Sequence, residues 1–139
     1  MPRILITGIS GFVGKEVARE ILKNSDNQVV GLIRPNTDNR RISEFKDKVE
    51  FIEADLCEIN KLKNILETNT FDTIVHIGAV RGGRPDAKEK YYLANVEATA
   101  VIANYCLENN ARLIYCSSVG VFGAIPKQLP ADDSTPKQD

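Results

Sequence analysis

The amino-acid sequence predicts an α/β domain built on a doubly wound parallel sheet. Short apolar runs alternate along the chain with segments of helical periodicity, a pattern typical of βαβ units. The runs, such as Ile-Leu-Ile at 4–6, lack alternating polar residues, which indicates a sheet covered by helices on both faces. Because crossovers between parallel strands are right-handed, we expect about five strands in the order 3-2-1-4-5.

Periodicity places each element of this domain in turn. Strands are expected at residues 3–7, 28–33, 49–53, 71–77 and 112–116. Helices are expected at residues 13–24, 58–68 and 86–109. The inner face of the last helix should carry Tyr92, Val96, Thr99, Ala103 and Cys106.

The composition separates one domain from a short tail. Residues 1–125 form the predicted domain, which is long enough to bury a core. Residues 126–139 are rich in proline and polar side chains, so we expect an extended or disordered tail. We further expect that this tail leads to a C-terminal part that the 139 residues do not contain.

Charge and cysteine content exclude several classes of function. The net charge of −1 gives no basic field that would attract nucleic acid or an anionic membrane surface. No apolar run approaches the length of a membrane span, and the N-terminus does not resemble a signal peptide. Three cysteines without CxxC spacing, Cys57, Cys106 and Cys116, predict free thiols in a reducing cytoplasm. With a single histidine, a metal site is not expected.

A glycine-rich turn follows the first predicted strand. Residues 7–14 read TGISGFVG and lead directly into the first predicted helix. Gly8 would permit a tight turn, Gly11 would let the backbone approach phosphates, and Gly14 would let the helix pack against the strand. The N-terminus of a helix also attracts anions. The segment therefore predicts a binding site for a dinucleotide pyrophosphate; the alternative is a plain glycine turn.

The spacing GxxGxxG after Thr7 resembles that of the extended short-chain dehydrogenase/reductases, the NAD-dependent epimerase/dehydratase family. Further motifs resemble those of this family in the same order: EADL at 53–56, HIGA at 76–79, NVEAT at 95–99 and YCSSVGVFG at 115–123. The resemblance covers nearly the whole chain. It implies a Rossmann fold, NAD(P) as cofactor, and an epimerase, dehydratase or reductase that transfers hydride to or from a sugar nucleotide or a small carbonyl compound.

The same resemblance implies roles for individual residues. Cofactor-binding positions would be Gly8, Ser10, Gly11, Phe12, Val13, Gly14, Asp55, Leu56, Ile77, Gly78, Ala79 and Asn95. Asp55 would accept a hydrogen bond from the adenine amino group, or else it caps the following helix. Asn95 would fix its helix beside the active site, or else it is a surface amide. Ser118 would be the catalytic serine that polarises the substrate oxygen, or else a serine in a turn.

The end of the second predicted strand bears on the choice of cofactor. The position that often holds an acid for the ribose 2′-OH is Ile33, and Arg34 follows it. Arg34 could pair with a 2′-phosphate, which favours NADP over NAD; the alternative is a solvated loop cation. Arg40 and Arg41 either reach the same phosphate or are merely exposed. We interpret His76 as a buried strand residue with a local hydrogen bond, not as a general base.

The acid–base pair of the family is not found in the 139 residues. In the family this pair is the tyrosine and lysine of a YxxxK motif, but none of the four tyrosines, Tyr91, Tyr92, Tyr105 and Tyr115, has lysine four residues later. We therefore expect this chain to bind the cofactor without turnover, as part of an enzyme that binds the small-molecule substrate elsewhere. The alternatives are a non-catalytic NAD(P)-binding sensor or interaction module and a scaffold domain without ligand.

Two further surfaces carry expectations about partners. The cationic loop 81–85 either meets an anionic substrate or is merely solvated. The exposed edge of the fifth predicted strand predicts self-association, and relatives of this family suggest a homodimer.

Overall fold

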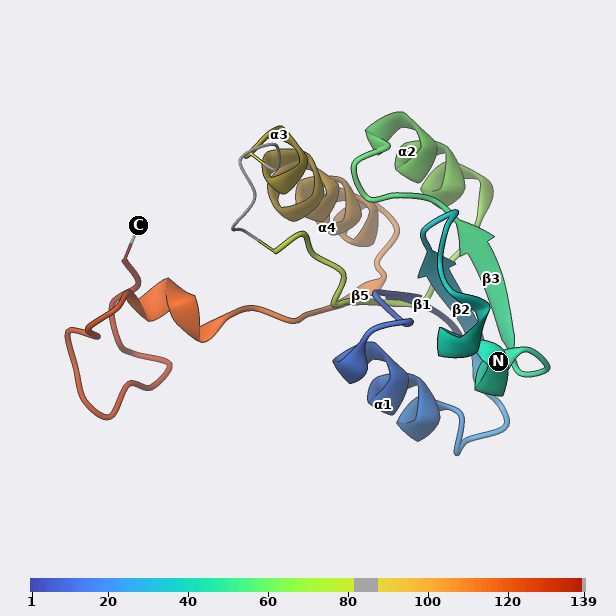
Figure 1. Cartoon of the computed structure of the whole chain (residues 1–139), viewed down its shortest axis with the longest axis horizontal. Coiled ribbons are helices and arrows are strands. Elements are labelled where there is room, and N and C mark those ends of the chain that lie inside the picture. Colours follow the sequence, from blue (N-terminus) through green and yellow to red (C-terminus); the bar gives the residue numbers. More distant parts are fainter. Residues whose placement is uncertain (82–87, 139) are drawn as a thin grey trace.

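A five-stranded parallel sheet forms the centre of the molecule in the computed structural model, which describes residues 1–81 and 88–138 (Figure 1). Its strands are β1 (Arg3–Thr7), β2 (Gln28–Ile33), β3 (Val49–Glu53), β4 (Thr73–His76) and β5 (Arg112–Tyr115). They lie in the order β3-β2-β1-β4-β5, all parallel, which confirms the predicted order. The first three strands have the predicted bounds, and β4 and β5 are shorter than expected.

Helices cover both faces of this sheet (Figure 1). The helices are α1 (Phe12–Ile21), α2 (Ile59–Thr68), α3 (Lys88–Tyr92), the π-helical turn η4 (Leu93–Glu97) and α4 (Ala98–Glu108). Short 3₁₀ turns are η1 (Asn39–Arg41), η2 (Ser43–Phe45) and η5 (Val119–Phe122). Helix α1 lies on one face, and α2, α3 and α4 lie on the other.

The alternation of side chains along β1 divides the core in two. Leu5 is fully buried in a cluster with Leu62 of α2 and Ile102 of α4. Its neighbour Ile6 points to the other face and joins a cluster with Ala18 of α1. Burial on both faces explains why the strand sequences lack polar alternation.

The predicted inner face of the long helix is wrong at its first two positions. Tyr92 and Val96 are 55% and 48% exposed, whereas Ala94, Ala98 and Ile102 are buried. The buried face of the helix consists of Ala94, Ala98, Ile102, Tyr105 and Cys106. The π-helical turn adds a residue to one helical turn and so rotates the residues before it relative to α4.

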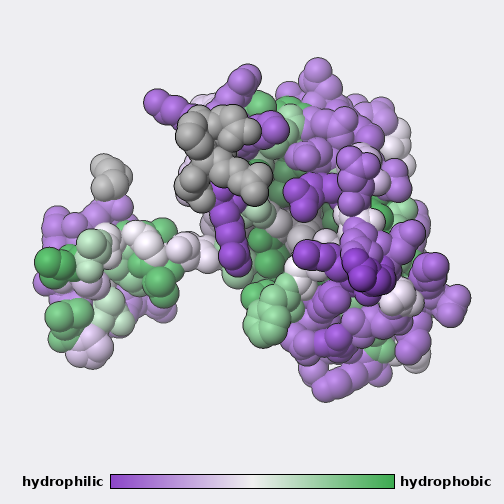
Figure 2. Space-filling model, viewed as in Figure 1, coloured by the Kyte–Doolittle hydropathy of each residue, from purple (hydrophilic) through white to green (hydrophobic). Residues whose placement is uncertain are grey.

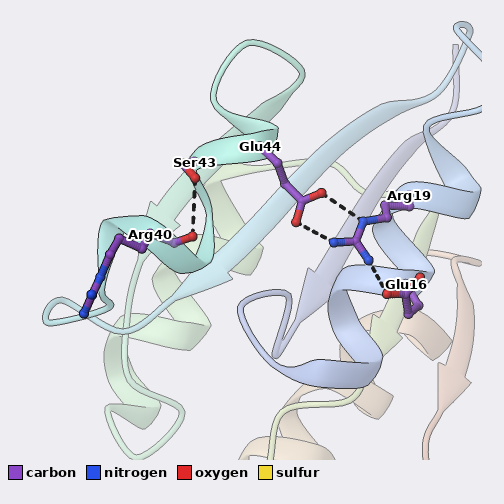
Figure 3. A network of polar contacts seen from close by, with 5 residues as sticks. All are labelled: Glu16, Arg19, Arg40, Ser43 and Glu44. Atoms are coloured by element: carbon purple, nitrogen blue, oxygen red, sulfur yellow. Dashed lines mark hydrogen bonds and ion pairs between the residues drawn. The ribbon is translucent and has the colours of Figure 1, made fainter.

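The segment after β2 is fixed to α1 by polar contacts, which Figure 3 shows, and by apolar contacts. Arg19 of α1 donates from Nε and Nη2 to the two carboxylate oxygens of Glu44, at 2.9 and 2.7 Å, and it also contacts Glu16. Ile42 and Phe45, on either side of Glu44, are buried in the cluster beneath α1. The segment that follows Arg34 is therefore held against the domain.

Strand β5 forms an exposed edge, and the chain then leaves the domain (Figure 1). Exposed apolar side chains, Val119, Ile125 and Leu129, lie on the departing segment, which stands apart from the body of the molecule in Figure 2. Within the described residues, no helix has the length and apolar character needed to cross a membrane.

Candidate functional site

The glycine turn joins the carboxyl end of β1 to the N-terminus of α1. Gly8 follows β1 with a φ of +74°, a conformation that side-chain-bearing residues rarely adopt. The amide of Gly11 donates to the carbonyl of Gly8 at 3.0 Å and closes the turn. Helix α1 then begins at Phe12 after Gly11, and no side chain caps the N–H groups of its first turn.

The three glycines differ in what surrounds them. A Cβ at Gly14 would lie 2.1 Å from the Gly8 carbonyl oxygen, and one at Gly8 would lie 2.7 Å from the Gly78 nitrogen. Packing within the chain therefore requires both glycines. At Gly11 the one close contact would be 3.2 Å, to the Gly8 oxygen, and φ is ordinary. The fold itself makes only a mild demand for glycine at position 11.

The loop after β4 lies against this turn. Thr7 Oγ1 accepts hydrogen bonds from the backbone amides of Ile77 at 3.1 Å and Gly78 at 3.0 Å. A Cβ at Gly78 would lie 3.0 Å from Leu56 Cδ1 and 3.2 Å from the Gly8 nitrogen. The structure therefore brings Gly8, Leu56 and Gly78 together, although they come from three separate strand ends.

Asn95 clamps the far end of the same loop. Its Oδ1 accepts from the Val80 amide and its Nδ2 donates to the Val80 carbonyl, both at 2.8 Å. Asn95 belongs to the π-helical turn, so this pair connects η4 with the loop after β4. Both polar groups of the Asn95 amide are thus occupied by backbone, which makes it a positioning residue for the loop.

His76 is buried as interpreted, at 1% exposure, and lies at the end of β4. Its Nδ1 lies 2.7 Å from Thr7 Oγ1, and its Nε2 lies 2.9 Å from Thr99 Oγ1. The Tyr115 ring stacks on it at a centroid distance of 5.6 Å. Burial lowers the pKa of His76 to about 4, so the ring is neutral at pH 7. Sequence reasoning missed Thr99 as a partner, and only its place in NVEAT could have pointed to it.

Asp55 forms a turn ahead of α2 but does not cap that helix, whose N-cap residue is Glu58. Its Oδ1 accepts from the Cys57 amide at 2.9 Å, and the Glu58 carboxylate accepts from the Asp55 amide at 2.9 Å. Burial, together with the Asp55 carboxylate, raises the pKa of the Cys57 thiol to about 11. This thiol is therefore protonated at neutral pH and is no nucleophile.

Arg34 is exposed directly after the buried Ile33 at the end of β2. Ile33 has no polar side-chain group for a ribose hydroxyl. The guanidinium of Arg40 is bound to the Asp38 carboxylate, with Nη2 at 2.7 Å from Oδ2, and this raises the pKa of Arg40 and lowers that of Asp38. Arg34 is thus better placed than Arg40 to meet a further anion.

Ser118 is not brought to the glycine turn. Its Oγ accepts from the Gly120 amide at 3.1 Å as the cap of η5, and the hydrogen bonds described for residues 117–138 all stay within that segment. Figure 1 shows this part of the chain leaving the domain. Residues 82–85 of the predicted cationic loop lie outside the described residues. Within the described part of the chain, no cluster of three His, Cys, Asp or Glu side chains could hold a metal.

Comparison with known proteins supports the resemblance in motifs. The model of the NAD dependent epimerase/dehydratase family matches residues 4–139. A UDP-glucose 4-epimerase of Caenorhabditis elegans is 29% identical over 147 residues, covering 95% of this chain and 42% of that protein. The chain spans between about a third and two fifths of the length of the curated relatives it matches.

Solved structures agree with the fold and with its extent. The UDP-Glc/GlcNAc 4-epimerase of Campylobacter jejuni superposes with a TM-score of 0.83 at 25% identity, over 99% of this chain and 43% of that one. A UDP-glucuronic acid 4-epimerase of Bacillus cereus, solved in complex with NAD, gives a TM-score of 0.68 at 26% identity, over 88% of this chain and 42% of that one.

Proposed function

The chain belongs to the NAD-dependent epimerase/dehydratase family, and we propose that it is the cofactor-binding part of an enzyme that transfers hydride between NAD(P) and a sugar nucleotide or small carbonyl substrate. Its relatives are named as UDP-sugar epimerases, which favours a sugar nucleotide.

Gly11 is the observation that carries this proposal. Packing within the chain explains Gly8 and Gly14, but only one mild contact restricts position 11. A glycine at the uncapped start of α1 suits the close approach of a pyrophosphate, whose charge the helix N-terminus stabilises. A ligand whose phosphates approach the backbone here would account for the rest of the demand for glycine at position 11.

Calorimetric titration of the folded chain with NADH and NADPH tests the proposal. We expect saturable binding to the unmodified chain and binding weaker by roughly tenfold or more in Gly11→Ala, in which a Cβ stands where phosphate approaches. Glu20→Ala, near the far end of α1, serves as the control and should bind as the unmodified chain does. Equal affinity of Gly11→Ala and the unmodified chain would contradict the phosphate site. No binding by a folded sample would contradict the function.

A preference for NADP over NAD stays a prediction that rests on Arg34. The relative solved with NAD does not support it. Replacing Arg34 with serine should weaken NADPH binding and leave NADH binding almost unchanged, because only NADPH carries the 2′-phosphate. If Arg34→Ser weakens both equally, Arg34 does not select the cofactor.

The proposal also covers the role of Ser118 in catalysis, the oligomeric state and the cellular location. Ser118 would polarise the substrate oxygen in the whole enzyme, while the 139 residues alone would show no turnover because they lack YxxxK. A homodimer and a cytoplasmic location are expected as well, the latter from the free cysteines. If the whole protein binds NAD(P) but never turns over, the alternative of a sensor or interaction module takes its place.

A further inference from the structure

Three neighbouring strands place Thr7, His76 and Tyr115 side by side. Thr7 of β1 is in register with His76 of β4, and His76 is in register with Tyr115 of β5. The buried imidazole therefore has a hydroxyl on one side and an aromatic ring on the other. From the helical layer, Thr99 of α4 reaches its second nitrogen.

The hydrogen bonds of Thr7 fix the protonation of this ring. A threonine hydroxyl has two acceptor lone pairs and one proton. Both lone pairs of Thr7 Oγ1 are used by the amides of Ile77 and Gly78. Its proton must therefore go to His76 Nδ1, 2.7 Å away, so that nitrogen carries no hydrogen. In the neutral ring the hydrogen is then on Nε2, which donates to Thr99 Oγ1.

The hydrogen bonds beyond the ring keep the same order of donor and acceptor. Thr99 uses its own proton to donate to the backbone carbonyl of Asn95 at 3.0 Å, within the π-helical turn. The Asn95 amide in turn holds both backbone groups of Val80. One chain of hydrogen bonds thus runs from the amides of Ile77 and Gly78, through His76 and Thr99, to the backbone carbonyl of Asn95. The side chain of the same Asn95 holds Val80 at the other end of the loop.

We propose that His76 and Thr99 are positioning residues, which connect the glycine turn to the π-helical turn and hold residues 77–80 in the shape that dinucleotide binding needs. This inference rests on the proposed function. The loop is anchored at one end by Thr7 and at the other by Asn95, and the bridge between these anchors is the imidazole in its Nε2–H form. π-Helical turns often occur at functional sites, and here the turn supplies both the carbonyl that ends the chain and the amide that holds Val80.

Nuclear magnetic resonance tests the tautomer directly, because His76 is the only histidine. Nitrogen chemical shifts of the histidine-labelled chain at neutral pH should show Nε2 protonated and Nδ1 unprotonated. A ring protonated mainly at Nδ1 would overturn the inference. This measurement needs no variant and no ligand, so it decides the direction of the chain even if the proposed function fails.

Two variants of Thr99 test the link to binding. Thr99→Val keeps the shape of the side chain but removes the acceptor for Nε2–H, whereas Thr99→Ser keeps the hydroxyl. We expect Thr99→Val to bind NADH on the order of tenfold more weakly and to lower the hydrogen-exchange protection of the Val80 amide. The ring should keep its Nε2–H form in this variant, because Thr7 still donates to Nδ1. Thr99→Ser should restore both binding and protection.

The outcomes separate this inference from the proposed function. If the unmodified chain binds no dinucleotide, the proposed function fails, while the tautomer and the Val80 protection still test the chain of hydrogen bonds. If the unmodified chain binds NADH and Thr99→Val binds it equally well, with Val80 equally protected, the positioning role is wrong. If Thr99→Val does not fold, Thr99→Ala is measured in the same three ways.

Discussion

The buried imidazole of His76 should make this domain sensitive to acid. In the unfolded chain a histidine has its ordinary pKa of 6.5, but burial lowers the pKa of His76 to about 4 in the folded state. Between these two values the unfolded chain binds a proton that the folded chain does not. The neutral ring therefore contributes stability above pH 6.5, and that contribution is lost as the pH falls toward 4.

The size of the loss follows from the difference between the two pKa values. One pKa unit corresponds to about 1.36 kcal/mol, so complete loss amounts to about 3 kcal/mol, and about 2 kcal/mol is lost by pH 5. Small domains are stable by about 5–15 kcal/mol in total, so the effect is large enough to measure. Protonation also removes the acceptor at Nδ1 that receives the proton of Thr7.

Urea unfolding at several pH values between 7 and 5 would check this. Carboxylates also titrate in this range, so the control is His76→Asn, which does not titrate at position 76 and retains an oxygen that can accept from Thr7. The variant should be less stable at pH 7, yet it should lose about 2 kcal/mol less than the unmodified chain on going to pH 5. Parallel losses in the two proteins would refute the assignment of the acid sensitivity to His76.

Three further substitutions have expected outcomes. Gly14→Ala should destabilise the fold by about 1–3 kcal/mol or more, because its Cβ would meet the Gly8 carbonyl at 2.1 Å; a urea midpoint equal to that of the unmodified chain would contradict this. Tyr105→Phe should cost about 1–3 kcal/mol in the free energy of unfolding, since it removes the hydroxyl that accepts from the buried Phe71 amide at 2.8 Å. Arg19→Met, at an exposed ion pair, should shift the urea midpoint little, and the small difference should shrink further in high salt.

Most of the architecture is determined locally, and the sequence alone was enough to predict it. The alternation of apolar runs and helical segments yields the parallel sheet and its strand order, because βαβ crossovers have one hand. The glycine turn could also be predicted. Gly8 has a φ of +74° and Gly14 has no room for a Cβ, and glycine is the residue type that suits both positions. Strand β1 pairs with β2 along its whole length and with β4 from Ile4 to Thr7, and its bounds were predicted without error.

The face of the long helix was decided by the tertiary structure. Large apolar side chains, Tyr92 and Val96, suggested an inner face by their hydrophobicity. The helix instead buries Ala94, Ala98 and Ile102, and the π-helical turn shifts the phase of the residues before it relative to α4.

In the candidate site, too, some features could be predicted from the sequence and others depend on the tertiary structure. Motifs were enough to predict Gly8, Leu56 and Gly78 as members of one site, and the structure brings the three residues together, because parallel strands end at the same edge of the sheet. Their contact with a cofactor stays a prediction. The two hydroxyl partners of the His76 imidazole are set by tertiary packing. Thr7 depends on the register of β1 and β4, and Thr99 depends on how α4 packs on the sheet. These distances join residues 69 and 23 positions apart in the chain, and such contacts are set only when the layers pack.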